Sequence, residues 1–509
     1  MEERRKSFQR YRMKPVCQRI IDRVGPVERN FLATMNIISR RDFLKIGAAG
    51  ATGVVLGGIR PFSQAYADEN QLDKKPNIIF VMLDDMGYGD LGVYGQKFIR
   101  MPNVDQMARE GIRYTNVYAG SPVCAPARSC LMTGQHTGNT TVRGNTGRGG
   151  VPCTGGGSGL RVPLKDGDIT VAEVLKEAGY VTGITGKWGL GEPGTSGIPN
   201  RQGFDEWFGL LNQRIAHSYY PSHIWHNEEQ LPLEGNTGTT AALETEAHYV
   251  HDLFTEFALD FIRRHGAGDT PFFLYLPYTI PHDAYQIPEL EPYTKKTDWP
   301  DQAKVYASML TRADRDMGRI FALLKELGID DNTIIFFCSD NGAANRYDGL
   351  FDSSGPLRGR KRDLYEGGIR TVMVVRWPGV INPGAVSDDI WYFPDVLPTL
   401  AELASAELPI GIDGVSVVRS LRSQPQPELH DRPLYWEFYE RGFQQAARKG
   451  DLKAVRPPRG QPIELYDLSN DVGEQRNIAD ENPWTVKWFD RFMRNARTPS
   501  PHWRSPFDP

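Results

Sequence analysis

The sequence predicts an α/β fold: a large, mostly parallel sheet flanked by helices, with a smaller antiparallel sheet near the C-terminus. Three apolar runs, residues 76–83, 272–276 and 333–339, carry this prediction. Such runs, rich in β-branched and aromatic residues, are typical of strands buried on both faces of a parallel sheet. Helical patterns lie between them, and this alternation is typical of a doubly wound domain.

Polar residues follow each of these strands. Asp84 and Asp85 come directly after the first strand and Asp340 and Asn341 after the third, while a short loop leads from the second to His282. Ligands of open α/β sheets gather outside the carboxyl ends of the strands. The three strand ends therefore predict one common site.

Helices account for much of the remaining large domain. Residues 168–170 are expected to cap a helix that runs through Ala178 and that Gly179 ends, before a strand at residues 180–184. Other helices are expected at 248–264, 303–327 and, closing the large domain, 394–400. The glycine-rich residues 144–159 are expected to form a loop.

A second domain is expected after the polar segment 419–431. Short strands at 433–438, 452–455 and 463–468, with a helix near the end, predict a small antiparallel sheet, and 496–509 should be irregular. The predicted division is a catalytic domain at 76–418 and an α+β domain at 432–509.

Residues 1–67 read as an extension and a twin-arginine signal peptide. Arg40 and Arg41 precede a small, apolar run at 46–59 and an A-x-A cleavage site at 65–67. The prediction is export in the folded state, a mature start at Asp68 and a periplasmic or secreted protein. The apolar run is too short for a permanent membrane anchor, although an anchored helix stays an alternative. Translation could start at Met1 or Met35.

The charge balance argues against nucleic acid as a partner. The chain has 59 Lys+Arg and 63 Asp+Glu, and removal of the 13 basic and 5 acidic residues in 1–67 leaves 46 and 58, a net charge of −12. A body this acidic repels polyanions. An anionic substrate would need a local cluster of cations.

Four cysteines follow the signal peptide. Cys338 lies in an apolar strand and is expected to be a small hydrophobic residue. A disulfide between Cys130 and Cys153 is left open. Cys124 stands in Cys124-Ala125-Pro126-Ala127-Arg128, and because a helix is expected from Ser129 onward, the thiol should lie just ahead of a helix N-terminus, which favours an anion. A buried structural cysteine is the alternative.

Together with the acidic pairs and Lys187, His282 and Lys361, this motif resembles the sulfatase family over residues 76–480. The resemblance implies an alkaline-phosphatase-like fold and the oxidation of Cys124 to formylglycine by a formylglycine-generating enzyme. In this mechanism one hydroxyl of the aldehyde hydrate attacks sulfur, and the other loses its proton and expels sulfate.

The resemblance also assigns the metal ligands. Asp84, Asp85, Asp340 and Asn341, with the residue made from Cys124, match a site of hard oxygen ligands. Calcium is the usual family metal, and magnesium would also suit these ligands. Each acidic pair alone could instead be a helix cap or a solvated turn.

Four further residues match family roles. Arg128 resembles the arginine that binds the formylglycine hydroxyl, and Lys187 and Lys361 match the two lysines that hold sulfate. His282 matches the histidine that protonates the leaving oxygen. A solvated surface charge is the alternative for either lysine.

One position departs from the family pattern. Gly189 stands where the family commonly has a histidine that removes a proton during sulfate release. His217, in an aromatic segment, is the candidate replacement, with His136 and His223 as competitors and a structural role as the alternative.

The leading hypothesis is therefore a calcium-dependent formylglycine sulfatase acting on a sulfated small molecule or glycan, with a carbohydrate sulfate preferred. A phosphonate monoester or phosphodiester hydrolase of the same superfamily is the second hypothesis. A non-catalytic binder of sulfated glycans is the third.

Overall fold

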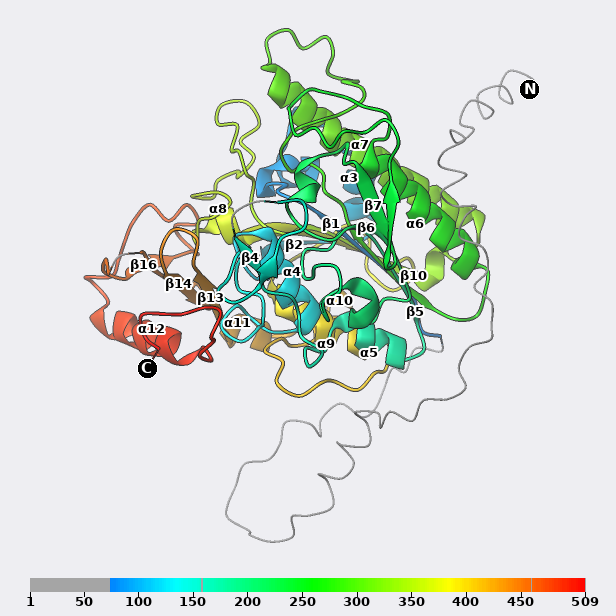
Figure 1. Ribbon diagram of the computed structural model, residues 1–509. Coiled ribbons are helices and arrows are strands. Elements are labelled where there is room, and N and C mark those ends of the chain that lie inside the picture. Colours follow the sequence, from blue (N-terminus) through cyan, green and yellow to red (C-terminus); the bar gives the residue numbers. More distant parts are fainter. Residues whose placement is uncertain (1–73, 157–158, 459, 509) are drawn as a thin grey trace, which may run out of the picture. The chain divides into compact units, whose positions relative to one another are not determined.

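A ten-stranded sheet forms the centre of the molecule, as the sequence predicted (Figure 1). The computed structural model describes residues 74–156, 159–458 and 460–508. Lys74–Pro509 form one compact unit. The predictions for the signal peptide, its cleavage site and the translation start lie outside the described residues.

The middle of the large sheet is parallel, and its strands β1, β9 and β10 are buried along their whole length. Strands β10, β1, β9, β5 and β6 run in one direction, whereas β11 and β7 are antiparallel to their neighbours. Leu83 pairs with Ser339, and Met82 with Pro277, so β1, β10 and β9 end at the same edge. In spatial order the strands are β12 (Ala385–Tyr392), β2 (Ile112–Tyr118), β11 (Arg370–Arg376), β10 (Thr333–Ser339), β1 (Asn77–Leu83), β9 (Phe272–Pro277), β5 (Val181–Lys187), β6 (Glu206–Leu210), β7 (His223–His226) and β8 (Glu229–Pro232).

Helices cover the sheet in two groups (Figure 1). In one group, α7 (Asp301–Glu326) packs on α3 (Pro102–Glu110) and α6 (Val250–Gly266). In the other, α9 (Val396–Leu403) packs on α4 (Cys124–Thr133), α5 (Val171–Glu177) and α10 (Val418–Leu421). The predicted helices at 248–264, 303–327 and 394–400 are thus confirmed within a few residues, and within the predicted cap 168–170 it is Thr170 that caps α5.

The C-terminal sheet has four antiparallel strands in the order β13 (Pro433–Phe438), β14 (Gln444–Lys449), β15 (Leu452–Arg456) and β16 (Glu464–Asp467), with α12 (Pro483–Asn495) packed on it. Strand β14 was not predicted, because its sequence QQAARK lacks the β-branched and aromatic residues that mark strands. The tail from residue 496 to 508 contains no helix or strand, as predicted.

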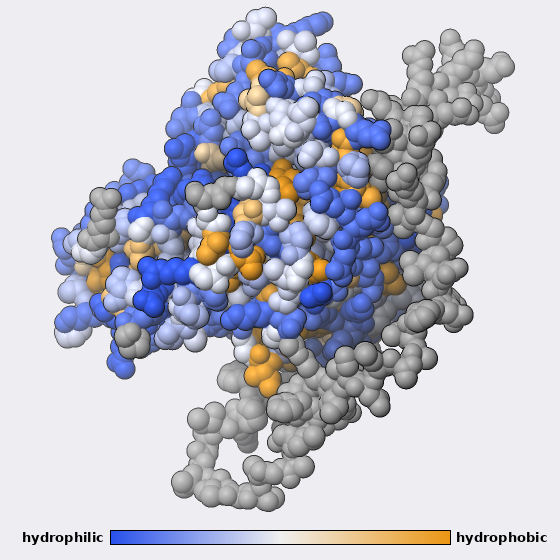
Figure 2. Space-filling view, viewed as in Figure 1, coloured by the Kyte–Doolittle hydropathy of each residue, from blue (hydrophilic) through white to orange (hydrophobic). Residues whose placement is uncertain are grey.

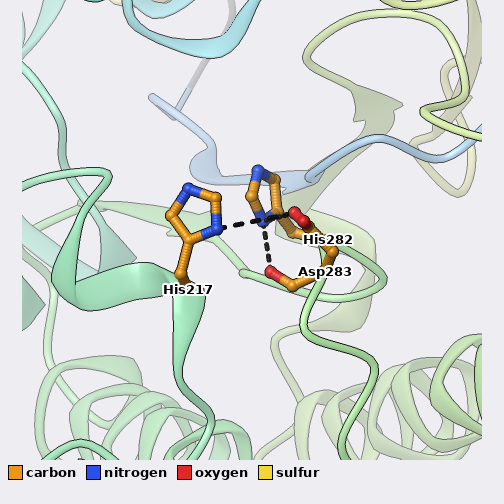
Figure 3. A group of neighbouring side chains, drawn as sticks. All are labelled: His217, His282 and Asp283. Carbon is orange, nitrogen blue, oxygen red and sulfur yellow. Dashed lines mark hydrogen bonds and ion pairs between the residues drawn. The ribbon is translucent and has the colours of Figure 1, made fainter. Parts of the chain in front are cut away.

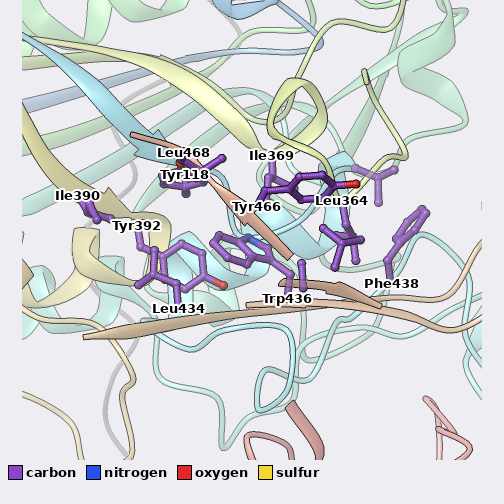
Figure 4. Close-up of a cluster of buried hydrophobic side chains, with 13 residues drawn as sticks. Tyr118, Leu364, Ile369, Ile390, Tyr392, Leu434, Trp436, Phe438, Tyr466 and Leu468 are labelled. Carbon is purple, nitrogen blue, oxygen red and sulfur yellow. The ribbon is translucent and has the colours of Figure 1, made fainter. Parts of the chain in front are cut away.

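A buried aromatic cluster joins the two sheets (Figure 4). The Trp436 ring of β13 lies 5.5 Å from Tyr118 of β2 and 5.1 Å from Tyr392 of β12. Lys453 of β15 reaches Glu366 in α8 (Glu366–Ile369) at 2.9 Å. The small sheet therefore packs directly on elements of the large one.

Several boundaries differ from the predictions. Helix α4 begins at Cys124 itself rather than after Ser129, because a proline in the first turn of a helix needs no N–H partner. The predicted glycine-rich loop contains β3 (Val151–Pro152), which pairs with β4 (Leu160–Arg161). The predicted linker contains α10 and α11 (Glu428–Asp431).

The four cysteines of the described residues are free thiols: Cys124, Cys130, Cys153 and Cys338. The disulfide between Cys130 and Cys153, which the sequence left undecided, is therefore not formed in this structure. Across the described ranges, no helix has the length and apolar character needed to cross a membrane. The face shown in Figure 2 is mostly hydrophilic, with apolar residues in small groups.

Candidate active site

The carboxyl ends of the central strands bring the predicted residues together. Asp84 and Asp85 follow β1, Asp340 and Asn341 follow β10, and Lys187 is the last residue of β5. All five side chains are buried. Their convergence follows from the parallel register of β1, β10 and β5, which places these ends at one edge.

The acidic residues form a compact oxygen cluster with unused acceptors. Asp84, Asp340 and Cys124 offer ligand atoms that all lie within 4.8 Å of one another. Asn341 donates its amide to Asp85 Oδ1 at 2.7 Å, which leaves Asn341 Oδ1 free. Asp84 Oδ1 and Asn341 Oδ1 are buried without a hydrogen-bond partner among the described residues. Buried oxygens without donors fit an oxygen-binding cation.

Cys124 opens helix α4 and is almost fully buried. Its Sγ lies 3.7 Å from Asn145 Oδ1, which also accepts a hydrogen bond from the Ala125 amide at 3.3 Å. Burial raises the pKa of the Cys124 thiol, more than the nearby Lys187 lowers it. The unmodified side chain is therefore a neutral thiol, and a thiol is a weaker nucleophile than a thiolate.

Arg128 lies one turn further along α4 and ties three strand ends together. Its guanidinium donates to Asp340 Oδ2 at 2.9 Å, to Asp84 Oδ2 at 3.2 Å and to the Lys187 carbonyl at 2.6 Å. A buried arginine with this many partners is rigid. Arg128 thereby fixes the carboxylates relative to Cys124.

Lys187 and Lys361 reach the oxygen cluster from two different parts of the fold. Lys187 Nζ lies 2.5 Å from Asp84 Oδ2, and Lys361 Nζ, from the loop before α8, lies 2.6 Å from Asp85 Oδ2. Burial alone would lower the pKa of each ammonium, but the carboxylates outweigh it and raise both values. Both lysines therefore stay charged and can bind an anion.

The neighbouring cations affect the pKa values of the carboxylates of Asp84 and Asp340 differently. Burial raises the pKa of Asp84, but Lys187, His282 and Arg128 outweigh it and hold the pKa well below its usual range. Burial and the neighbouring Asp84 charge raise the pKa of Asp340 to about 7. Asp84 is accordingly the fully ionised member of the pair.

The His282 ring is held by the neighbouring residue Asp283 (Figure 3). Its Nδ1 lies 2.9 Å from Asp283 Oδ1 and 2.6 Å from the Asp283 carbonyl, while Nε2 lies 3.5 Å from Asp85 Oδ2. The carboxylate and carbonyl fix a proton on Nδ1 and aim Nε2 into the site. Asp283 was not predicted from the sequence, although its position next to His282 is a usable signal.

His217 contacts this same group. Its ring centroid lies 4.7 Å from that of His282, and its Nδ1 is 3.6 Å from Asp283 Oδ1. Burial and the neighbouring His282 lower the pKa of His217 to about 4, so it is neutral near pH 7. The competing candidates lie in other surroundings: His136 contacts Asp413 and Tyr435, and His223 is on β7.

Gly189 is covered by a side chain that the sequence did not single out. Gln213 Nε2 donates to the Gly189 carbonyl at 3.1 Å and stands where a Cβ at position 189 would overlap it. Gly189 also has a φ of +88°, a left-handed conformation that favours glycine. Nothing in the local sequence marks Gln213 or Asn145, because tertiary folding alone brings them here.

Comparisons with known proteins agree with this geometry. The sulfatase family model matches residues 76–406, the model described as N-sulphoglucosamine sulphohydrolase, C-terminal, matches 359–487, and the twin-arginine signal model matches 38–57. The last match shows an export signal and hence a periplasmic or secreted protein.

Individual relatives cover most of the chain. N-acetylgalactosamine-6-sulfatase of Sus scrofa is 33% identical over 74% of this chain and 71% of its own. Arylsulfatase A of Homo sapiens is 31% identical over 83% and 87%. The crystal structure of Ps i-CgsB in complex with k-i-k-neocarrahexaose has a TM-score of 0.70 and 27% identity, covering 82% of this chain and 92% of that one. The chain therefore belongs to the sulfatase family and is a sulfuric ester hydrolase.

Proposed function

We propose that this enzyme hydrolyses carbohydrate sulfates with a formylglycine made from Cys124 and one bound calcium ion. The observation that carries the proposal is the grouping of Cys124 with the buried carboxylates of Asp84 and Asp340, whose ligand atoms all lie within 4.8 Å of one another. In the described part of the chain, Asp84 Oδ1 and Asn341 Oδ1 are buried without a hydrogen-bond partner. These features support a site in which the nucleophile and a cation act on one sulfate.

The cation would be held by Asp84, Asp85, Asp340 and Asn341, with the oxygen of the modified Cys124. The set contains only oxygen donors, which suits calcium or magnesium rather than a metal that prefers nitrogen or sulfur. When bound, such an ion would stabilise charge on a sulfate oxygen and on the nucleophile.

Formylglycine fits position 124 better than cysteine does. A thiosulfate formed on cysteine would have no easy release step, whereas an aldehyde hydrate offers a second hydroxyl. Arg128 and Asn145 would orient this group, because both lie at Cys124 or its helix. The helix N-terminus adds a favourable field for the developing anion.

Lys187 and Lys361 would neutralise the sulfate oxygens, and His282 would protonate the leaving alcohol. Asp283 holds Nδ1 of His282, so Nε2, on the side of the ring that faces Asp85, would carry the proton toward the substrate. His217, neutral near pH 7, is the proposed base for sulfate release in place of a histidine at position 189.

The relatives support a carbohydrate substrate. One is named for N-acetylgalactosamine 6-sulfate, and a structural neighbour was solved with an oligosaccharide. An exported enzyme would meet such glycans outside the cytoplasm. A panel of sulfated sugars and aryl sulfates would test this, and faster turnover of aryl sulfates than of every sugar would contradict it.

The decisive test is the mass of the tryptic peptide 114–128 from an active preparation. Conversion of Cys124 to formylglycine makes this peptide about 18 Da lighter and removes the thiol. Because twin-arginine export moves folded proteins, conversion must occur in the cytoplasm, so activity should require a formylglycine-generating enzyme in the host. Cys124→Ala should be folded and inactive. A fully alkylatable peptide in an active enzyme would refute the mechanism.

Two alternatives are separated by kinetics. A phosphonate monoester or phosphodiester hydrolase would prefer an aryl phosphodiester to the matching aryl sulfate. A non-catalytic binder would bind sulfated glycans without turnover even when fully modified. Both alternatives fail if the modified enzyme prefers sulfate esters.

A further inference from the structure

A cavity of about 340 Å³ opens beside the residues that hold His282. Asp283, in its wall, contacts His282 Nδ1 at 2.9 Å, so the cavity begins one side chain away from the proposed leaving-group acid. A substrate with its sulfate on the oxygen cluster would extend its alcohol portion past His282. The polar groups of the wall come from Arg214, His217, Thr240, Asp283, Tyr285 and Gln302.

The segment that carries Arg214 is rigid. Asn212 Oδ1 accepts hydrogen bonds from the amides of Arg214 at 3.0 Å and Ile215 at 3.1 Å. The Asn212 amide in turn donates to the buried Glu192 at 3.0 Å. These bonds fix the start of the short turn η5 (Ile215–His217). The side chains of Arg214 and His217 therefore project from the same fixed segment.

Buried hydrogen bonds also hold a second part of the wall, the segment that carries Thr240. Gln286 is fully buried, accepts a hydrogen bond from the Tyr219 amide at 2.9 Å and donates to the Ala241 carbonyl at 2.9 Å. It thereby holds the segment that carries Thr240. A cavity with fixed walls needs little ordering when a ligand binds.

Charge distinguishes Arg214 from the other groups in the wall. Asp283 is engaged by His282 and His217, which together hold its pKa below the usual range. His217 is neutral near pH 7. The Arg214 guanidinium is exposed and forms no ion pair within the part of the chain that the structure describes.

We propose that this cavity is a subsite for a second anionic group of the substrate, a sulfate or a carboxylate, and that Arg214 binds it. The proposal rests on the proposed function and names the substrate class as a carbohydrate with at least two anionic groups. Guanidinium matches the planar or tetrahedral oxygens of such groups with paired N–H donors. Thr240 and Gln302 offer neutral partners for sugar hydroxyls.

The test compares three substrates on the fully modified enzyme with its metal. They are N-acetylgalactosamine 6-sulfate, its 4,6-disulfate, and a disaccharide that joins the monosulfated sugar to a uronic acid. The wild type should show a higher kcat/KM for at least one doubly charged substrate, mainly through KM. Arg214→Gln should lower that preference about tenfold, and Arg214→Lys less, because lysine keeps the charge but loses the paired donors.

Arg491→Gln is the matched control, since Arg491 is an exposed arginine on α12 and the substitution removes the same charge. Its preference should equal that of the wild type. A preference for the 4,6-disulfate would identify the second bound anion as a sulfate, and a preference for the disaccharide with the uronic acid would identify it as a carboxylate. Turnover of the monosulfated sugar with no wild-type preference, or with a preference unchanged in Arg214→Gln, overturns the subsite alone. Absence of turnover on all three overturns the proposed substrate class itself.

Discussion

Gln213 covers Gly189: its amide donates to the Gly189 carbonyl at 3.1 Å and fills the space that a side chain at position 189 would need. Gly189, which stands where the family commonly has a histidine, thus lies in a corner that the Gln213 side chain fills. The space that a histidine side chain would need is not left empty. A histidine could enter this corner only if the Gln213 side chain shifted and gave up its hydrogen bond to the Gly189 carbonyl.

We therefore expect Gly189→His to fail alone. The left-handed φ of +88° and the overlap with Gln213 should together destabilise the fold by about 1–2 kcal/mol or more. Adding Gln213→Ala should recover part of the loss. Melting temperatures of the four enzymes of this cycle measure the coupling, and an unchanged melting temperature in Gly189→His would contradict the overlap.

Lys187→Ala and Lys361→Ala should each lower turnover by roughly 10²-fold or more, the scale of one preorganised charge stabiliser. Arg128 still pairs with Asp84 in the first variant, so the fold should persist. Lys165→Ala, which removes an exposed lysine, is the control. Near wild-type activity in both variants would remove the lysines from the sulfate site.

Asp340→Ala should lose the metal. The change removes one carboxylate of the cluster and one partner of Arg128, while Asp84 remains to pair with the guanidinium. Elemental analysis of purified enzyme measures the bound ion and identifies it as calcium or magnesium. One full equivalent in the variant would exclude Asp340 as a ligand.

The two histidines should act in different steps. His282→Ala should slow the first step most for alcohols that are poor leaving groups, and Asp283→Asn should do so more weakly because it only orients the ring. His217→Ala should instead let the covalent sulfated enzyme accumulate. Intact-protein mass spectra during turnover distinguish these outcomes, and a small, equal effect of His217→Ala on all substrates would leave it a structural role.

Asp90 should make stability depend on pH. Its Oδ2 accepts from Tyr306 at 2.5 Å and from the Gly87 amide at 2.7 Å, but Oδ1 has no partner among the described residues, and burial raises its pKa from 3.8 to about 7. The folded state therefore holds more protons than the unfolded state between these values. Stability should fall as the pH rises from about 4 to about 7 and then level off.

Asp90→Asn should remove this component, because the amide stays neutral. The melting temperature of the variant should fall less than that of the wild type over the same pH interval. Asp298→Asn, a change at an exposed aspartate, should leave the wild-type slope intact. Parallel slopes in Asp90→Asn and wild type would show that Asp90 is ionised throughout.

The sequence predicted the parts of the fold that local patterns mark. The apolar strands β1, β9 and β10 and their polar ends could be predicted, because parallel strands buried on both faces are continuous apolar runs in the sequence. Strand β14 was not visible, since its burial depends on the partner strands rather than on its own residues.

The same distinction applies to the site. Motif residues such as Cys124, Arg128 and Asp340 could be predicted from their neighbours in sequence. Gln213 and Asn145 could not, because their side chains meet the motif only through contacts 24 and 20 residues away. Asp283 is an intermediate case, because it was not predicted although it directly follows the predicted His282 in the sequence.

The contacts around Cys124 have a consequence for the timing of biosynthesis. Trp436 donates to the Ala119 carbonyl, Glu437 pairs with Arg143 and Glu440 with Asn145, so the shell of the nucleophile is completed by residues about 300 positions later in the chain. At ordinary translation rates these residues emerge roughly 15–60 s after Cys124. Under the proposed formylglycine mechanism, the enzyme that oxidises Cys124 would have this interval on the ribosome in which to act, and a slow codon stretch before residue 432 would lengthen it.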